Sequence, residues 1–199
     1  MISTVVHDYF EKVAKGYSDF REKGMIGKLV ASEKKAIISL LPDLNGKTVI
    51  DLGCGAGFYA KIASERGARV VGVDLSSSMV QRARKIVKDV IEASITTVSF
   101  QQAFDVALCC GSLEFIADQK GAIANVASLL KRNGLLIILY PERSFGSFLY
   151  YCYHRFLHRI FLTILSFEEL HQLLVGTGFV MEERKSANFI NFALRYRKQ

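Results

Sequence analysis

Apolar residues follow two different spacings along this chain. From Val5 to Tyr17 and from Ile26 to Leu41 they recur at helical spacing, and Pro42 ends the second run. From residue 47 onward, short apolar runs such as Thr48–Leu52 and Ala68–Val73 alternate with amphipathic stretches. This alternation predicts buried parallel strands joined by helices, in a doubly wound α/β sheet with right-handed crossovers.

The first predicted strand leads into a glycine-rich turn. Gly53, Gly55 and Gly57 stand at alternate positions, and a helix is predicted from about Phe58. Glycine is needed where the backbone turns tightly or where a ligand approaches closer than a Cβ allows. The helix offers free N–H groups and a positive dipole end. Asp74 ends the next apolar run at the same edge of the sheet, where its carboxylate can accept from both hydroxyls of a ribose. Together these features predict a nucleoside site.

The glycine spacing and Asp51 indicate which nucleoside the site takes. A dinucleotide fold favours G-x-G-x-x-G, whereas here Phe58 stands at the place of that third glycine. Asp51 precedes the turn, where it would repel a pyrophosphate but suit a cationic amino group. The combination Asp-x-Gly-x-Gly-x-Gly, with an acid ending the next strand, resembles the first two motifs of class I S-adenosylmethionine-dependent methyltransferases. A nicotinamide-dependent dehydrogenase is disfavoured by these residues and by the absence of a Tyr-x-x-x-Lys pair.

The resemblance continues downstream. Phe104–Ile116 looks like the family's fourth strand and loop, Leu129–Tyr140 like its fifth strand, and Ser166–Phe179 like its late helix. It covers roughly residues 45–199 and implies a Rossmann-like doubly wound, mostly parallel sheet with a C-terminal antiparallel hairpin, here 179–183 and 188–196. We expect a single methyltransferase domain over 1–199. Its parts would be an N-terminal helical cap (1–44), a cofactor-binding half (45–140), a lid insertion (141–165), and a late helix with the hairpin (166–199).

The resemblance implies S-adenosylmethionine as cofactor. Cys54 and the three glycines would wrap its methionine moiety, Asp51 would hold the ammonium directly or through water, and Asp74 would accept from the ribose. The structural alternatives are capping of the glycine turn by Asp51 and N-capping of the following helix by Asp74. The remaining implied contacts are Leu75 and Met79 on the adenine face, Cys110 and Gly111 along the site, and Tyr9, Phe10 and Tyr17 as a lid. Core packing is the alternative for these aromatics.

Adenine recognition departs from the family pattern. Relatives present a Gly-Asp after the third strand, and this chain has none. We expect an intact helix over 76–90 and a strand over 95–100, because the latter stretch is β-branched. Ser99 or Gln101 would then take the place of the acid. In the alternative register the strand ends earlier and Glu92 is the adenine acid.

The catalytic residues stay unassigned at this point. Methyl transfer from a sulfonium is an in-line displacement that depends on alignment and exclusion of water, and a base is needed only where the acceptor loses a proton. Glu114 is the titratable group of the loop after the fourth strand, where it would orient an acceptor or begin a helix. His154 and His158 are candidates for a general base. No acid accompanies them in their segment, so no metal site is expected.

The segment from Ser144 to Leu165 contains seven aromatic residues and no acid. At helical spacing its apolar residues between Phe148 and Ile160 share one face, and the histidines and arginines gather on the other. Three interpretations stay open: a surface helix packed by its apolar face, a lid for a large hydrophobic acceptor, or an interfacial helix in peripheral contact with an anionic membrane. The stretch from His158 to Leu170 is similar in character to enzymes that methylate tetrapyrrole carboxylates or isoprenoid quinones.

Composition narrows the compartment and the partners. Half of the 199 residues are apolar, enough for a sizeable core. The net charge of +7 is spread out with interleaved acids, which disfavours a nucleic-acid partner. No apolar run approaches the roughly 20 residues of a membrane span, and no signal-peptide core is evident. Four cysteines without a C-x-x-C predict neither disulfides nor zinc, which favours a reducing cytoplasm.

We therefore expect methyl transfer from S-adenosylmethionine to a small acceptor that is apolar and ring-like or lipid-like. The alternative is a non-catalytic methyltransferase-like subunit that regulates or binds a partner. The absent Gly-Asp would fit that alternative, as would Phe115 at the place where many relatives carry a histidine. The oligomeric state, and whether oxygen, nitrogen or carbon is methylated, are not predicted.

Overall fold

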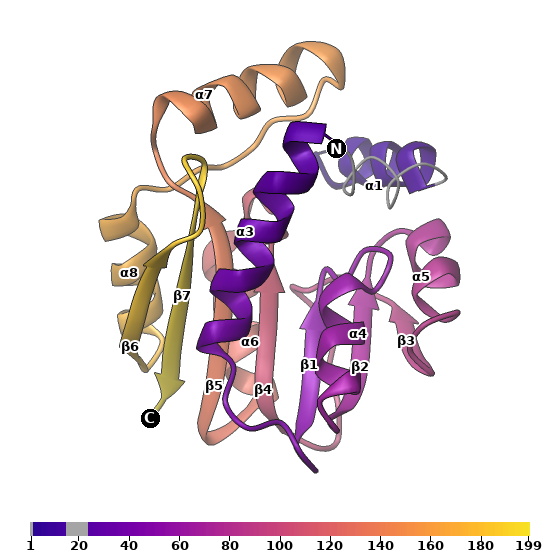
Figure 1. Ribbon diagram of the computed structural model, residues 1–199, viewed down its shortest axis with the longest axis vertical. Coiled ribbons are helices and arrows are strands. Elements are labelled where there is room, and N and C mark those ends of the chain that lie inside the picture. Colours follow the sequence, from indigo (N-terminus) through magenta and orange to yellow (C-terminus); the bar gives the residue numbers. More distant parts are fainter. Residues whose placement is uncertain (1, 15–23) are drawn as a thin grey trace.

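The computed structural model describes residues 2–14 and 24–199, and Tyr17 lies outside them. Within these residues seven strands form one sheet in the order β3-β2-β1-β4-β5-β7-β6 (Figure 1). Strands β1 to β5 run parallel, and β7 pairs antiparallel with β5 and β6. The mostly parallel sheet with a C-terminal hairpin is confirmed. The strands are β1 (Thr48–Leu52), β2 (Arg69–Asp74), β3 (Asp89–Glu92), β4 (Phe104–Cys110), β5 (Leu130–Pro141), β6 (Phe179–Ser186) and β7 (Asn191–Lys198).

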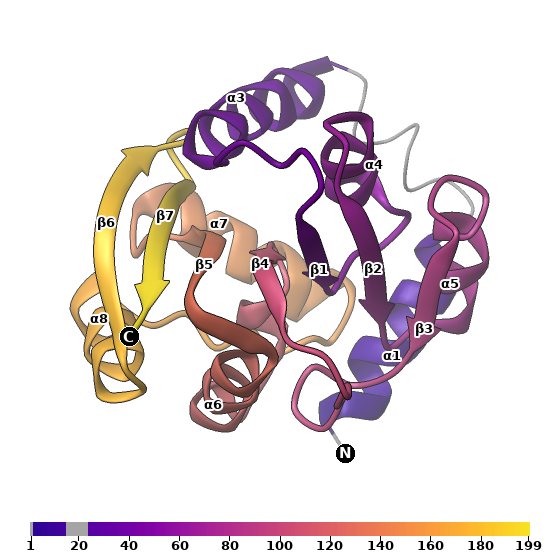
Figure 2. The same cartoon turned by 90° about the horizontal axis from the view of Figure 1, so that it is seen from below.

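Helices cover both faces of the sheet. Helices α3 (Gly24–Leu40) and α4 (Phe58–Glu65) lie on one face, and α6 (Gln119–Leu129) and α8 (Phe167–Gly176) on the other (Figure 2). Helix α5 (Ser77–Ala83) packs on β2 and β3, and α1 (Ile2–Val13) packs against α5. Both helices predicted before residue 42 are thus present. The remaining turns are η2 (Leu113–Phe115) and, at the end of α7 (Phe145–Cys152), a single π-helical turn η3 (Tyr153–Leu157).

The core lies on both sides of the central strands. Along β5, Leu136, Ile138 and Tyr140 point into the cluster formed with α6 and α8. The residues between them point into the cluster formed with α3 and α4. Because successive side chains of a strand point to opposite faces, a strand buried on both faces reads as one continuous apolar run. This explains why the sequence pattern predicts these strands well.

The predicted helix over 76–90 is wrong, and so is the strand over 95–100. Helix α5 ends at Ala83, and β3 pairs with β2 from Asp89 to Glu92. Arg84 stabilises this short turn, because its guanidinium donates two hydrogen bonds to the Val90 carbonyl oxygen, 3.1 and 2.9 Å from Nε and Nη2. The β-branched stretch is instead a turn whose Ile95 and Val98 carbonyls accept from the Asn125 amide at 2.7 and 2.9 Å. The alternative register, with the strand ending at Glu92, is the one that the structure has.

The segment from 144 to 165 also differs from its prediction. One of the three interpretations, a surface helix packed on the domain, requires a buried apolar face, yet Phe148 is 58% exposed and Phe156 is 76% exposed, while His154 is buried. The exposure of Phe148 already lies within α7, ahead of the π-turn, and the π-turn then changes the direction in which the side chains from Tyr153 onward point. The interpretation of a surface helix packed on the domain by this face is therefore wrong.

Across residues 2–14 and 24–199, no helix combines the length and the apolar composition that crossing a membrane requires.

Candidate functional site

A cavity of about 970 Å³ opens beyond the carboxyl ends of β1, β2 and β4. Ligands of doubly wound sheets bind at this edge, close to the point where the strand order reverses. The cavity wall is built from the glycine turn, the turn after β3, the loop after β4, and helices α1, α3 and α4. The expected site residues on this wall are Gly53, Cys54, Gly55, Asp74, Leu75, Cys110, Gly111 and Phe10.

The glycine turn brings two strands and the β4 loop together. The Gly53 and Cys54 N–H groups both donate to the Val73 carbonyl, at 2.8 and 3.0 Å. Gly53 has φ 74°, and a Cβ placed there would lie 2.4 Å from the Ser112 Cβ. Only glycine fits this conformation and this approach without displacement. The backbone hydrogen bonds and the glycine therefore hold the conformation of the turn without any contribution from a ligand.

Gly57 has a different role from the one expected. It does not line the cavity, and its missing side chain leaves room for α5, since a Cβ would lie 3.3 Å from the Ala83 Cα. Met79 does not reach the cavity either, because it occupies the first turn of α5 with its side chain fully buried. Tyr17 lies outside the described residues. The structure thus separates Gly57 and Met79 from the cavity wall described above.

Asp74 joins the two predicted motifs directly. One carboxylate oxygen accepts from the Gly55 N–H at 2.8 Å, and the other accepts from the Ser76 N–H at 2.9 Å. Burial raises the pKa of Asp74 above its ordinary value, while these hydrogen bonds lower it. The helix N-cap is Ser76 and not Asp74, because the Ser76 hydroxyl accepts from the Met79 N–H. Asp74 therefore lies on the cavity wall and also holds the glycine turn in place.

Asp51 lies behind the glycine turn and is only 1% exposed. Among the described residues its Oδ2 has no hydrogen-bond partner. Burial raises the pKa of Asp51 to about 7, and a hydrogen bond from the Ala60 backbone offsets this only in part. A buried carboxylate oxygen without a partner is costly, so this atom suits a cationic group placed beside the turn, directly or through water.

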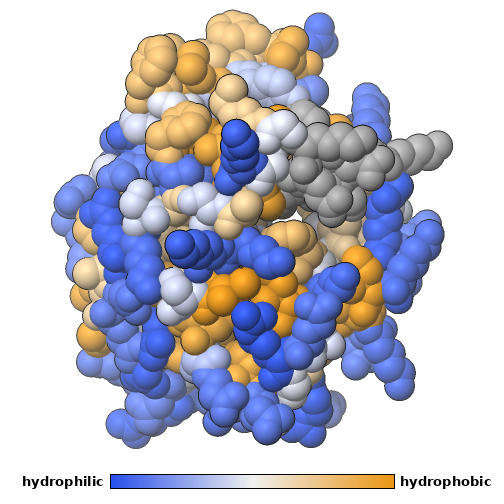
Figure 3. All heavy atoms as spheres, viewed as in Figure 1, coloured by the Kyte–Doolittle hydropathy of each residue, from blue (hydrophilic) through white to orange (hydrophobic). Residues whose placement is uncertain are grey.

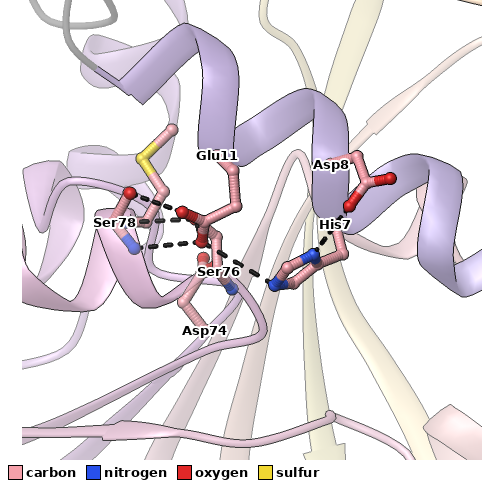
Figure 4. Close-up of polar contacts among 7 residues, drawn as sticks. His7, Asp8, Glu11, Asp74, Ser76 and Ser78 are labelled. Atoms are coloured by element: carbon pink, nitrogen blue, oxygen red, sulfur yellow. Dashed lines mark hydrogen bonds and ion pairs between the residues drawn. The ribbon is translucent and has the colours of Figure 1, made fainter.

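A contact that sequence reasoning missed holds α1 beside the cavity (Figure 4). The Glu11 carboxylate accepts from the Ser76 hydroxyl at 2.7 Å, from the Ser78 N–H at 3.0 Å, and from the Ser78 hydroxyl. These bonds, those from Ser78 first, hold the pKa of Glu11 at about 2. The contact places Phe10 and Val6 on the cavity wall. The Glu11 contact joins residues more than 60 positions apart in the sequence, so no local sequence pattern indicates it.

Replacing Glu11 with Gln is expected to loosen α1. The amide group keeps the size of the side chain but presents an N–H₂ donor where the carboxylate accepts from Ser78. Amide hydrogen exchange over residues 5–11 should become about ten-fold faster, a value that allows for partial solvent screening. The matched control is Asp8→Asn on the same helix, because the Asp8 side chain is 60% exposed and pairs with the ring of the adjacent His7. Equal exchange in the two variants would contradict the role given to Glu11.

The loop after β4 buries a second carboxyl group. Glu114 is 3% exposed, and within the described residues its Oε2 has no hydrogen-bond partner. Burial, with a further contribution from the nearby Glu33 charge, raises the pKa of Glu114 to about 8. Its Oε1 lies 3.8 Å from the point where a Cβ of Gly111 would be. Gly111 lines the cavity, so the missing side chain leaves Glu114 close to the cavity wall.

The two histidines lie away from the cavity wall. His154 is buried among the rings of Tyr9, Phe115 and Tyr150, with centroid distances of 5.5, 5.5 and 4.6 Å. Burial lowers the pKa of His154 to about 4, so this ring is neutral near pH 7. His158 packs 4.6 Å from Tyr9. None of the three catalytic candidates lines the cavity itself: Glu114 lies beside Gly111, which does, and His154 packs on Phe115, which does. Among the residues described, no group of three possible metal ligands occurs.

The turn after β3 presents hydroxyl groups at the place where the family pattern has an acid that binds adenine. Ser94 and Thr96 line the cavity, whereas Glu92 is exposed and does not. Neither Ser99 nor Gln101 reaches the wall. The Ser94 and Thr96 hydroxyls lie 2.8 Å apart, so the turn is ordered by its own side chains. Polar recognition at this end of the cavity therefore falls to hydroxyl and backbone groups.

Comparisons with known proteins agree on one family. Residues 50–138 match the family model described as "Methyltransferase domain". A ubiquinone biosynthesis O-methyltransferase of Coxiella burnetii is 32% identical over 118 residues, which cover 54% of this chain and 49% of that protein. The corresponding enzyme of Pasteurella multocida is 33% identical over 150 residues, or 65% of this chain and 61% of that protein. The chain spans about half the length of the first of these relatives.

Solved structures show the same fold. The magnesium protoporphyrin IX methyltransferase of Synechocystis, solved with bound SAH, superposes with a TM-score of 0.80 at 19% identity. The alignment covers 100% of both chains. At this identity the likeness establishes the fold alone.

Proposed function

Since this chain belongs to the class I S-adenosylmethionine-dependent methyltransferases, we propose that it transfers a methyl group from S-adenosylmethionine to a small acceptor. The observation that carries the proposal is Asp74, which lies on the cavity wall with both carboxylate oxygens anchored to the ends of the two motifs. A carboxylate fixed in this way has remaining lone pairs for two ribose hydroxyls. The cofactor-bearing relatives support the same assignment.

Different residues around the cavity would contact different parts of the cofactor. Gly53, Cys54 and Gly55 would wrap the methionine moiety, and the unpartnered oxygen of Asp51 would take up its ammonium. Leu75 and the β3 turn would hold the adenine, with hydroxyls in place of the family's acid. Cys110 and Gly111 would present backbone groups from β4. Each of these roles is a proposal that rests on where the side chain lies.

Catalysis would come mainly from alignment and exclusion of water. Bound S-adenosylmethionine supplies an electrophilic methyl group on a sulfonium. Val6 and Phe10 from α1, with Phe115 from the β4 loop, close the cavity by apolar surface. Holding an acceptor in line with the methyl group in a site of this kind contributes up to roughly 7–11 kcal/mol in favourable cases. The reaction dissipates charge, which an apolar surrounding favours.

Glu114 is the proposed proton acceptor for a hydroxyl substrate. Its Oε1 lies 3.8 Å from the position that a Cβ of Gly111 would take, and Gly111 lines the cavity. With a pKa of about 8 it is largely protonated at neutral pH, so the rate should rise with pH through that value. An acceptor that loses no proton would not show this rise.

Glu114 also predicts how stability depends on pH. Its pKa is raised from 4.5 in the unfolded chain to about 8 in the folded protein, so the folded state binds the extra proton. Its contribution to the free energy of unfolding is complete below pH 4.5 and is lost as the pH rises to about 8. Between pH 6 and pH 8 the free energy of unfolding, measured in urea, should fall for the wild type. For Glu114→Gln this fall should be smaller by at least about 1 kcal/mol. Glu168→Gln, an exposed glutamate of α8, is the control. Identical pH profiles for wild type and Glu114→Gln would contradict the prediction.

The acceptor is proposed to be apolar and the compartment cytoplasmic. Apolar side chains on the cavity wall include Val6 and Phe10 of α1, Val30 of α3, and Phe115 and Ile116 of the β4 loop. The names of the relatives refer to ubiquinone biosynthesis and to magnesium protoporphyrin IX, and these classes support a ring-like or lipid-like acceptor. The four described cysteines are free thiols, which supports a reducing compartment. No observation favours a nucleic-acid partner.

Calorimetric titration with S-adenosylhomocysteine and, separately, NAD tests the proposed cofactor. Micromolar binding of the homocysteine nucleoside without binding of NAD is the expected result, and the reverse preference would overturn the proposal. Transfer of a labelled methyl group to a panel of apolar phenols, carboxylic acids and amines then tests the reaction. Cofactor binding with no turnover on any acceptor would favour the non-catalytic, partner-binding alternative instead.

A further inference from the structure

The end of the molecule that carries the cavity also carries an exposed apolar surface. Helix α7 lies beyond the carboxyl ends of the strands (Figure 1), and hydrophobic side chains gather there at the top of the space-filling view (Figure 3). We call this surface the outer ridge. Its exposed residues are Phe145, Phe148, Leu149, Phe156, Leu157 and Phe161.

Positive charge accompanies the outer ridge. Arg159 is exposed, and the Arg155 guanidinium stacks 4.2 Å from the centre of the Phe161 ring. No acidic residue occurs anywhere between 144 and 165. Elsewhere along the chain acids and bases are interleaved, so this combination of apolar and cationic groups is local to the ridge.

We propose that the outer ridge docks on the surface of an anionic phospholipid bilayer. Phenylalanine and leucine side chains on a helix lower their free energy by entering the boundary between headgroups and acyl chains, and neighbouring arginines are attracted to anionic headgroups. The ridge is convex, as the 76% exposure of both Phe145 and Phe156 indicates. A convex apolar surface suits a deformable bilayer better than it suits a rigid partner without a matching groove.

Charge disfavours a second copy of this chain as the occupant. In a twofold dimer the same surface lies on both sides of the interface. Arg155 and Arg159 of one ridge would then face the same arginines of the other, with no acid between 144 and 165 to pair with them. Like charges brought together at an interface oppose association. An anionic bilayer has the opposite charge.

The underside of the ridge connects it to the cavity. His154 of η3 packs on Phe115, and Phe115 packs 5.1 Å from Phe10. Both Phe115 and Phe10 line the cavity. Docking would therefore bring the cavity mouth to the bilayer surface, so that a lipid-like acceptor enters without crossing bulk water. This last step rests on the proposed function, whereas docking itself does not.

Vesicle co-sedimentation tests the docking. The full chain is sedimented with vesicles of phosphatidylcholine alone or of phosphatidylcholine with phosphatidylglycerol. Binding is expected to the mixed vesicles, and Arg155→Gln with Arg159→Gln should weaken it roughly 30-fold, the factor for two charges at about 1 kcal/mol each. Phe148→Ser with Phe156→Ser should remove binding to the mixed vesicles. Phe148, Phe156 and Arg159 are exposed and Arg155 is half-buried, so the variants should keep a melting temperature close to that of the wild type.

The matched control substitutions lie away from the outer ridge, at the amino ends of two strands and on α8 and β6. Arg69→Gln with Arg132→Gln removes the same charge from exposed positions at the amino ends of β2 and β5. Val175→Ser with Val180→Ser removes exposed apolar groups from α8 and β6. Both controls should bind as the wild type does. Equal loss in the controls, or no binding to either vesicle, would overturn the proposal.

A dimer in sedimentation velocity that the Phe148→Ser, Phe156→Ser variant dissociates would also overturn it, in favour of an interface between copies. S-adenosylhomocysteine titration of the ridge variants distinguishes this inference from the proposed function. If S-adenosylhomocysteine still binds but the protein does not dock on vesicles, the docking inference is overturned and the proposed function stands.

Discussion

Asp74→Ala is expected to weaken binding of S-adenosylhomocysteine by ~100-fold or more, because two hydrogen bonds to a charged acceptor contribute roughly 1.5–3 kcal/mol each. The loss has a second source in the protein itself. Without the carboxylate, the Gly55 and Ser76 N–H groups lose their acceptor, so the glycine turn is no longer fixed. Calorimetry well below the melting temperature measures the binding loss, and urea unfolding measures the structural loss separately.

Two companions to Asp74→Ala make its result interpretable. Asp74→Asn keeps one acceptor oxygen and the side-chain size, so it should fall between the wild type and the alanine variant. Asp89→Ala removes the same charge from an exposed position at the start of β3 and should leave nucleoside binding unchanged. A change of less than about five-fold in Asp74→Ala, which is near 1 kcal/mol, would contradict the assignment of this carboxylate to the ribose.

Gly53→Ala is expected to reduce the free energy of unfolding by roughly 2–5 kcal/mol. Left-handed backbone costs a non-glycine residue about 1–2 kcal/mol, and an added methyl group in a packed site costs about 1–3 kcal/mol more. Both causes are present, since Gly53 has φ 74° and the new Cβ would lie 2.4 Å from the Ser112 Cβ. Urea unfolding gives the change directly.

Gly178→Ala separates these two causes. Gly178 has φ 87°, but no atom lies within 4 Å of the position that a Cβ would take, so this variant should show the backbone cost alone. Adding Ser112→Gly to Gly53→Ala removes the atom that is too close and should recover part of the loss, which a double-mutant cycle measures. If Gly53→Ala costs no more than Gly178→Ala, the close approach of the β4 loop to the glycine turn is not rigid.

The sequence predicts the elements whose signals are local. Strand β1, the glycine turn and the Asp74 end of β2 are all where the pattern indicates, because buried parallel strands read as continuous apolar runs and the turn conformation requires glycine. The C-terminal hairpin is also present, although β6 and β7 run to Ser186 and Lys198, beyond the expected ends. Local chemistry fixes the elements better than it fixes their limits.

The elements that the sequence mispredicts depend on side-chain contacts and backbone irregularities that the apolar pattern does not encode. Helix α5 ends early because Arg84 reaches Val90, and the β-branched stretch is a turn because Asn125 holds its carbonyls. Helical projection could not show the π-turn at Tyr153–Leu157, within which Phe156 is exposed. Likewise Gly57 reads as a ligand-binding glycine and instead makes room for a helix.

Helix α1 is held beside the cavity by the Glu11 carboxylate together with the ring contacts of Tyr9 and Phe10, and how firmly it is held would influence how long a ligand stays inside. While Glu11 is bonded to Ser76 and Ser78, Phe10 remains on the cavity wall, so lifting of α1 would widen the exit for a bulky nucleoside. Lifting α1 breaks the Glu11 contacts but leaves the sheet intact, so it occurs far more often than global unfolding. For an enzyme of the proposed kind, the residence time of the spent nucleoside would then set the turnover rate once acceptor is abundant. The strength of the Glu11 contacts with Ser76 and Ser78, remote from the reacting atoms, would thereby influence the turnover rate.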